Sequence, residues 1–250
     1  MSHARTPLVS LATLVSLVVS LAGCNALSPG DTTSDSSDPT AGGTATDTGN
    51  TPTEAMGIPD VTIYDIQQGK VTDKTVVELK NVIVTSPIFY DKKLNGNFFI
   101  SELGGGPFSG IQVYVYADVI AQLEAEGNLP AVGDTLDLRV LYSEFFEYSE
   151  TTLSNVVDLT ITGTGKLPTP DTVAAADIAT GGAKAEDYEG CLVQIANAKV
   201  TAPVVMFGEF EVDGALKVDD LFFVPTPGPT PPVDTTFTSL VGQVIYSFEE

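Results

Sequence analysis

The stretch GIQVYVYADVIAQLEAEGNLPAVGDTLDLRVLY, residues 110–142, decides the fold, because it places one helix between two strands of a small β-domain. In its first part, Ile111, Val113 and Val115 alternate with glutamine and tyrosine. A period of two residues is typical of a strand with one buried face. We therefore expect a strand over Gly110–Tyr116.

The middle of this stretch predicts a helix over Asp118–Glu126, where Val119, Ile120 and Leu123 recur at helical spacing. A glycine and a proline follow, and both residue types end helices. Alternation resumes over Asp134–Tyr142, which predicts the next strand.

Three more strands and a short helical segment complete the domain. Strands are expected over Thr75–Thr85, Asn97–Glu102 and Thr151–Thr162, and a helical lead-in over Val61–Gly69. The order is three strands, a helix and two strands, which fits an OB-fold, a five-stranded Greek-key barrel. Another small barrel or a sandwich would have the same periodicity.

A loop is expected between the first two strands, bracketed by Pro87 and by Asn95-Gly96. Asn-Gly is a strong signal for a tight hairpin turn. The loop would contain Phe89-Tyr90 and the charged residues Asp91-Lys92-Lys93, which we interpret as a solvated turn.

An internal repeat indicates a second copy of this domain. A D-I-x-x-G motif occurs at Asp65–Gly69 and at Asp177–Gly181, and V-T-[SA]-P occurs at Val84–Pro87 and at Val200–Pro203. Two further matches keep the same order: Gly96–Ile100 with Gly208–Val212, and Val140–Ser143 with Val244–Ser247. The chain is therefore predicted to contain two tandem domains, residues 61–165 and 166–250.

The second copy is less regular than the first. Its strands are expected over Gly190–Val200, Phe207–Asp213, Leu216–Val224 and Phe237–Ser247. A run with five prolines, residues 225–232, stands where the first copy has its helix, and proline is excluded from helix interiors. No fifth strand follows, so we expect an incomplete barrel with an unpaired edge on its first or fourth strand, from a truncated reading frame or fragment.

The N-terminus indicates export and a lipid anchor. Leu21-Ala22-Gly23-Cys24 ends an uncharged apolar run and reads as a lipobox, so residues 1–23 are predicted to be a lipoprotein signal peptide. The run is too short to span a membrane. Cys24 would carry the lipid, and residues 24–60, rich in Thr, Ser, Gly and Asp, would form a disordered tether. Because Asn25 is not aspartate, we expect the outer membrane of a Gram-negative bacterium; an ordinary signal peptide with a coincidental cysteine is the alternative.

Composition excludes much chemistry. Without residues 1–23 the chain keeps 10 of its 11 basic residues, all 33 acidic residues and no histidine. Histidine-dependent catalysis and histidine metal sites are therefore excluded. With Cys24 lipidated, Cys191 has no disulfide partner and is interpreted as a core thiol. The acidic residues include no D-x-D-x-D-G loop, so we predict no metal site, no cofactor and no catalytic residues.

These motifs, together with G-D-x-L at Gly133–Leu136, resemble those of OB-fold domains beside the catalytic domains of bacterial extracellular nucleases and phosphoesterases. They are also similar to those of uncharacterised acidic bacterial lipoproteins. The resemblance covers residues 61–250 and implies the fold; the catalytic domain of those nucleases has no counterpart. It also implies nucleic acid as a ligand class, but the net charge of −22 opposes binding to phosphates.

Aromatic residues gather where an OB-fold presents its ligand face, on strands two and three and the adjoining loops. Strand alternation should bury some of them, such as Phe98, and the loop aromatics could instead pack the barrel end. The candidate ligand-binding residues are Phe89, Tyr90, Phe99, Tyr114, Tyr116, Phe145 and Phe146.

These observations predict an all-β lipoprotein with two tandem OB-like five-stranded Greek-key barrels, the second lacking its last strand. We expect a non-enzymatic binding or adaptor module with a protein or glycan partner, anchored to the membrane by lipid. The alternatives are an accessory nucleic-acid-binding subunit of an extracellular nuclease and a structural spacer. A polar, uncharged cleft lined by aromatics would favour a glycan, a basic groove nucleic acid, and a flat apolar patch a protein.

Overall fold

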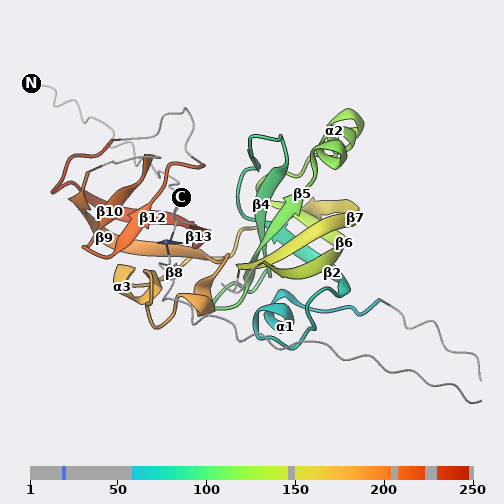
Figure 1. The fold of residues 1–250 in the computed structure, drawn as a ribbon, viewed down its shortest axis with the longest axis horizontal. Coiled ribbons are helices and arrows are strands. Elements are labelled where there is room, and N and C mark those ends of the chain that lie inside the picture. Colours follow the sequence, from blue (N-terminus) through green and yellow to red (C-terminus); the bar gives the residue numbers. More distant parts are fainter. Residues whose placement is uncertain (1–18, 21–57, 146–149, 204–207, 223–229, 248–250) are drawn as a thin grey trace, which may run out of the picture.

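The structure is a computed structural model that describes residues 19–20, 58–145, 150–203, 208–222 and 230–247. It is mostly β, with a closed five-stranded barrel and a second sheet lying side by side (Figure 1). Few helices accompany them. Within the described ranges, no helix is both long enough and apolar enough to cross a membrane.

The barrel is formed by the first half of the chain. Its strands are β2 (Val76–Val84), β4 (Gly96–Ser101), β5 (Gly110–Val115), β6 (Asp134–Phe145) and β7 (Glu150–Thr164). The order around the barrel is β2-β6-β7-β5-β4, and pairing of β2 with β4 closes the ring. All of these pairings are antiparallel except β5 with β7, where Gln112 lies opposite Thr152.

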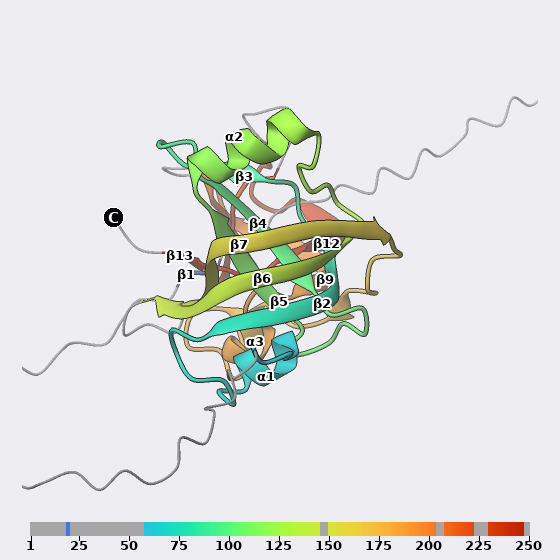
Figure 2. The same cartoon turned by 90° about the vertical axis from the view of Figure 1, so that its right-hand side faces the viewer.

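Two helices cover the barrel ends. Helix α1 (Ile63–Gln67) packs at one end and α2 (Ala117–Glu126) at the other, between β5 and β6 in the chain (Figure 2). Thr62 and Asp65 form a reciprocal capping box at the start of α1. The predicted helical lead-in, the helix between the third and fourth strands and the five strands are therefore confirmed, with ends that differ by at most three residues.

The alternation in the sequence builds the barrel core. Side chains from all five strands and both helices fill the core. In each strand every second side chain points inward, as the two-residue period of a β-strand predicts. The largest fully buried members include Ile63, Ile66, Leu79, Phe98, Ile100, Ile111, Leu136, Leu138 and Leu153.

The predicted loop after the first strand is wrong in two respects. Phe89–Tyr90 forms a short strand, β3, which pairs with Gly96 and Asn97 of β4. The Asn-Gly pair is not the turn: the turn spans residues 91–95, and Leu94 takes the left-handed conformation with φ 66°. A Cβ on Gly96 would lie 2.6 Å from Cδ1 of Ile120 in α2, so a larger residue there would displace the end of that side chain.

The second sheet has the order β11-β10-β9-β12, with β8 pairing in parallel with β9. A short α3 (Ala175–Ile178) and a 3-10 turn, η1 (Glu186–Tyr188), precede β9. Its core is a separate cluster around Ile178, Val193 and Val212. The strand bounds are β8 (Asp171–Thr172), β9 (Leu192–Ala202), β10 (Phe210–Val212), β11 (Leu216–Val218) and β12 (Thr236–Gln243).

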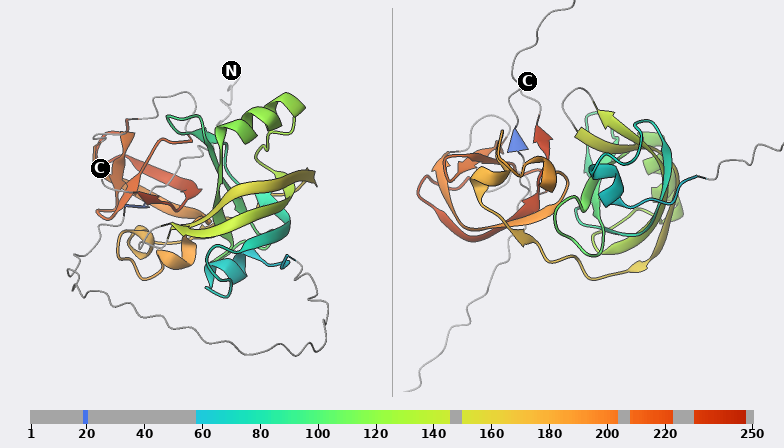
Figure 3. Two further views of the ribbon diagram at one scale, coloured as in Figure 1. Left: turned by 45° about the vertical axis from the view of Figure 1, so that its right-hand side comes forward. Right: turned by 90° about the horizontal axis from the view of Figure 1, so that it is seen from below.

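Among the described strands of this sheet, β8, β11 and β12 each pair with one neighbour and form its edges. The fourth predicted strand of the copy, β12, is therefore at an edge, and the first, β9, is not. Beyond β12, β13 (Tyr246–Ser247) pairs in parallel with β1 (Val19–Ser20), seen as a blue arrow beside it in Figure 3. The rest of the predicted signal peptide, Cys24, most of the tether and most of the proline-rich run lie outside the described residues.

The repeated motifs adopt matching local structures. Gly69 and Gly181 both have left-handed backbones after their short helices, with φ 68° and 73°. Asn81 and Asn197 are also left-handed within their strands, with φ 53° and 55°. The two motif aspartates, Asp65 and Asp177, each form an ion pair with a following lysine, at 3.0 and 2.8 Å.

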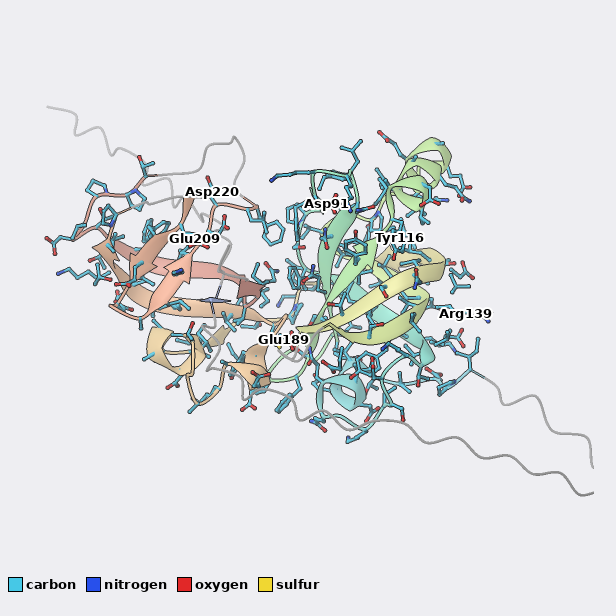
Figure 4. The ribbon with its side chains drawn as sticks, viewed as in Figure 1. Asp91, Tyr116, Arg139, Glu189, Glu209 and Asp220 are labelled. Carbon is cyan, nitrogen blue, oxygen red and sulfur yellow. The ribbon has the colours of Figure 1, made fainter. Side chains whose placement is uncertain are left out.

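The two halves contact each other through backbone and side chains. The Phe108 N–H donates to the Asp187 carbonyl at 2.6 Å, and Gln243 Nε2 donates to the Thr85 carbonyl at 2.9 Å. Glu189 lies at this seam in Figure 4. The barrel and the second sheet therefore meet over the outer face of β4 and β5.

Candidate ligand-binding cleft

The outer face of β4 and β5 carries three cross-strand pairs. Ser101 lies opposite Gly110, Phe99 opposite Gln112, and Asn97 opposite Tyr114. Side chains opposite one another in antiparallel strands share a face. This row is divided in two: the Ser101 and Phe99 end meets the second sheet, and the Asn97 end remains open.

The covered half is an aromatic contact. Phe222, which follows β11, lies edge-on to Phe89 and Phe99, with ring centroids 5.4 and 6.2 Å apart. Phe99 is 1% exposed, so it is closed to a ligand in this arrangement.

The open half is a cleft of about 590 Å³, within the range typical of small-molecule sites. Its walls come from β4, β5, β6 and β7, because the parallel pairing of Gln112 with Thr152 continues the outer face across the barrel. The lining residues are Lys74, Asn97, Gln112, Tyr114, Tyr116, Ser143, Glu144, Thr152 and Ser154.

Polar groups with fixed positions form the floor. Asn97 is only 5% exposed, and its Oδ1 accepts a hydrogen bond from Gln112 Nε2 at 2.8 Å. Thr152 is also buried, beside Gln112 on the neighbouring strand. Amides and hydroxyls both donate and accept, so this floor suits a ligand rich in hydroxyl or amide groups.

Two tyrosines form one wall. Tyr114 and Tyr116 are edge-on, with ring centroids 5.3 Å apart, and Tyr116 is 45% exposed. An exposed aromatic ring beside polar groups offers a flat surface for stacking. Burial, followed by the carboxylate of Asp91, raises the pKa of Tyr114, so its hydroxyl remains protonated near neutral pH.

The β3–β4 turn holds this wall in place. Asp91 accepts hydrogen bonds from the Lys93 and Asn95 N–H groups and from Asn95 Nδ2, at 2.7, 2.9 and 2.8 Å. The side chain of Asn95 lowers the pKa of Asp91. Asn95 Oδ1 then accepts from the N–H of Ala117 at 3.0 Å, and so fixes the chain directly after Tyr116.

A charged pair marks the other end of the cleft. Lys74 and Glu144 both line the cleft there. Asp73, next to Lys74, accepts a hydrogen bond from the Glu144 N–H at 2.9 Å and so connects the two segments. The hydroxyl of Tyr142 donates to the Glu144 carboxylate. Burial, then this hydrogen bond, raises the pKa of Tyr142. Among the described lining residues, the charges of Lys74 and Glu144 are opposite in sign and balance.

The structure brings together only part of the predicted ligand face. Tyr114 and Tyr116 line the cleft, while Phe89 and Phe99 face Phe222. Tyr90 is half exposed but lies opposite Gly96 on the other side of β4, away from Asn97. The backbone of Phe145 ends β6, and Phe146 lies outside the described residues.

The polar floor was absent from the sequence prediction. Asn97 and Gln112 occupy the same alternate positions as Phe99 and Tyr114, so strand periodicity already placed them on the outer face. The sequence pattern that indicates this floor is a polar residue at an outward-facing position on each of two adjacent strands. A ligand face defined by aromatic residues alone does not include these two residues.

The described part of the chain contains no group of three or more His, Cys, Asp or Glu residues able to hold a metal ion. The acidic residues of the second sheet have other contacts. Asp213 accepts from the Lys199 N–H at 3.0 Å. Asp219 lies near Asp220 and Glu209, and burial, then these carboxylates, raises its pKa to about 6.

Comparison with known proteins adds little. No protein-family model matches the chain, and no curated protein is significantly similar to it. A solved structure assigned as an aspartyl-tRNA synthetase from Leishmania major Friedlin has 11% sequence identity and a TM-score of 0.33. The alignment covers 48% of this chain and 23% of that chain. A likeness this slight carries no argument about fold or function.

Proposed function

We propose that this chain is a non-enzymatic binding module of the cell envelope that holds a glycan in the cleft on its first barrel. The observation that carries the proposal is the composition of the described lining: two tyrosine rings, buried amide and hydroxyl groups, and one positive and one negative side chain. Sugars offer flat apolar ring faces and many hydroxyls, which such a lining complements.

The alternatives fit the cleft less well. Nucleic acid requires several basic side chains, but Lys74 is the one basic side chain in the described lining, which also holds Glu144. The whole chain has a net charge of −22. A protein partner would favour a flat apolar patch, whereas this surface is concave and polar.

The proposal includes the fold and the location. The closed barrel with a helix between its third and fourth strands is consistent with an OB-like domain, whose ligand face lies on the second and third strands. Matching backbone conformations at Gly69 and Gly181, and at Asn81 and Asn197, support a second copy of the domain. A lipid on Cys24 would hold both at the membrane.

Binding is tested by titrating the purified full chain with neutral oligosaccharides and with single-stranded DNA at low salt. Saturable sugar binding without DNA binding supports the proposal. DNA binding that weakens steeply with salt would replace it with the nuclease-accessory function. Absence of binding to both classes would leave the structural spacer as the better interpretation.

The anchor is tested separately by metabolic labelling with a radioactive fatty acid. We expect label on the parent chain and on the Cys191→Ser variant, and none on Cys24→Ser. Because Cys191 is the other cysteine of the sequence, this pair of variants separates lipidation at the lipobox from any other thiol modification.

A further inference from the structure

The second sheet repeats the pairing of the first barrel for four strands. β9, β10, β11 and β12 pair with one another as β2, β4, β5 and β6 do, and each of these pairings is antiparallel. In the first barrel, β7 then lies between β5 and β6 and completes the ring. The corresponding place in the second sheet is between β11 and β12, and we call it the fifth-strand position. None of the described strands β8–β12 occupies it.

An extended segment lies in part of the fifth-strand position. In the first barrel, Tyr142-Ser143 of β6 lies opposite Thr152-Leu153 of β7. The repeat counterpart, Tyr246-Ser247, forms β13 and lies opposite Val19-Ser20 of β1, which also contacts β11. β1 is parallel to β13, whereas β7 is antiparallel to β6. Backbone pairing at this position is therefore not limited to one direction.

The β12 edge beside this position has neither of two common safeguards of free edges. Exposed edge strands often carry charges or a proline, which hinder pairing with another chain. β12 reads TFTSLVGQ over Thr236–Gln243 and contains neither. Its counterpart β6, which has neighbours on both sides, contains Asp137, Arg139 and Glu144. In a chain with a net charge of −22, an uncharged edge indicates a strand that pairs with a partner.

The backbone of β12 presents hydrogen-bond donors to the fifth-strand position. The N–H of Val244, directly after β12, donates to the Cys191 carbonyl at 3.2 Å and therefore faces β9. The register of β12 on β9 is continuous from Gln243 to Ser239, and successive N–H groups of a strand point to opposite sides. The N–H groups of Gln243, Val241 and Ser239 therefore face away from β9.

Apolar side chains at the fifth-strand position would extend the core of the second sheet. β11 and β12 contribute Leu216 and Leu240 to that core. In the first barrel, Leu159 and Ile161 of β7 pack against the core, while Thr160 between them is exposed. A strand that fits the fifth-strand position should therefore have the same alternation.

We infer that the fifth-strand position of the second sheet binds an extended segment of another polypeptide, antiparallel to β12 and with apolar side chains at alternate places, as in β7. Such a segment pairs with β11 and β12 at once, whereas a folded second copy of this chain could place its own edge against β12 alone. Main-chain hydrogen bonds supply the affinity of a strand added in this way, and the alternate side chains supply its specificity. The site is separate from the cleft and does not depend on glycan binding.

The probe for the test is a synthetic peptide with the sequence of β7, residues 150–164, carrying a fluorescent label. Its anisotropy should rise saturably on titration with the full chain, because β1 holds the position through two residue pairs and the peptide offers many more. Val19→Pro removes a backbone donor from β1 and should bind the peptide at least as tightly. Saturable binding by the parent chain or by this variant supports the inference, and its absence from both overturns it.

A second peptide and a pair of variants test the mode of binding. A peptide with Leu159→Asp and Ile161→Asp should bind at least tenfold more weakly, because its charges would face the core. In the full chain, Ser239→Pro removes an N–H that faces the position, at an exposed site on an edge strand, where proline is tolerated. This variant should bind the β7 peptide at least fivefold more weakly, whereas Ser239→Ala keeps the N–H and should retain full affinity.

Hydrogen exchange of the Ser239 and Val241 amides locates the peptide independently. The β7 peptide should slow both, and unchanged exchange overturns the inference whether or not Ser239→Pro folds. Equal binding of the two peptides, or equal binding to Ser239→Pro and Ser239→Ala, also overturns it. A dimer of the chain that is lost in Ser239→Pro but is not displaced by the peptide would assign the edge to a second copy instead.

Discussion

Gly110 of the first barrel and Gly190 of the second sheet meet backbone against backbone. A Cβ built on Gly110 would lie 2.1 Å from the carbonyl oxygen of Gly190, and one built on Gly190 would lie 2.8 Å from the carbonyl carbon of Gly110. Real Cβ atoms do not approach other atoms so closely. The contact between the two halves therefore requires glycine on both sides, and it positions Phe222 over the aromatic half of the β4–β5 face.

Replacing Gly110 with alanine should force the two halves apart. We expect Gly110→Ala to lower the free energy of unfolding by about 1–3 kcal/mol, as overpacking does in well-packed interiors. Gly163→Ala on β7 is the matched strand control, because its added Cβ would lie 3.5 Å from its nearest neighbour, an ordinary contact. Thermal unfolding measures both; equal midpoints for the two variants would contradict the close contact.

Removing the Phe222 ring should open the aromatic half of the face. Phe222→Ala deletes both edge-on ring contacts and should destabilise the chain by about 3 kcal/mol. The Phe237 ring packs on Phe210 within the second sheet. The control variant Phe237→Ala should therefore also be less stable than the parent chain, but it should not expose the first barrel. Hydrogen exchange of the β3 and β4 amides distinguishes them: it should rise in the first variant, and a rise in both would show that Phe222 has no special role there.

Much of the first barrel could be predicted because its signals are local. The alternation of Ile111, Val113 and Val115 marks an inward face, and the motif aspartates and glycines mark short helical turns wherever they occur. The same periodicity places Asn97 and Gln112 on the outer face. The polar floor of the cleft can therefore be predicted from the alternation of these two strands.

The remaining features depend on contacts between distant residues. The sequence pattern does not indicate that Phe222 packs on Phe89 and Phe99, or that Gly190 lies on Gly110, because these partners are far apart along the chain. Asn95 looks like a hairpin residue, yet its side chain bonds to the N–H of Ala117, 22 residues away. β3 was missed because two residues carry too little pattern to distinguish a strand from a loop.

Tyr116 should contribute to ligand binding with little effect on stability. The ring is 45% exposed, so Tyr116→Ala removes an apolar surface whose burial against a sugar ring should contribute about 1–2 kcal/mol, or roughly five- to 30-fold in affinity. Tyr90→Ala is the control, because Tyr90 is 50% exposed but lies on the other side of β4. Titration with the oligosaccharide that binds the parent chain should separate them, and equal losses would place the ligand elsewhere.

Asn95 should act on binding through the tyrosine wall. Asn95→Ala removes the bond to the Ala117 N–H and the bond to Asp91, with a loss of about 1–3 kcal/mol of stability. Because the chain after Tyr116 is then less well held, affinity should also fall, whereas Asn128→Ala, beyond the far end of α2, should leave affinity unchanged. Chemical denaturation and titration are measured together; lower stability with full affinity would show that the turn does not position the wall.

Asp219 should make the second sheet more stable in mild acid. Its pKa rises from the ordinary 3.8 to about 6, chiefly through burial and then through Asp220 and Glu209. Between these values the folded chain binds a proton that the unfolded chain has released, so this group lowers stability as pH rises from about 4 to 6. Below pH 4 both states are protonated and the effect disappears.

We expect Asp219→Asn to raise the free energy of unfolding at pH 7 by about 1 kcal/mol, a value reduced by the partial exposure of the carboxyl, and to change it little at pH 4. Asp158→Asn, at an exposed position on β7, is the control. Unfolding curves at both pH values give the result, and an Asp219→Asn effect independent of pH would refute the raised pKa.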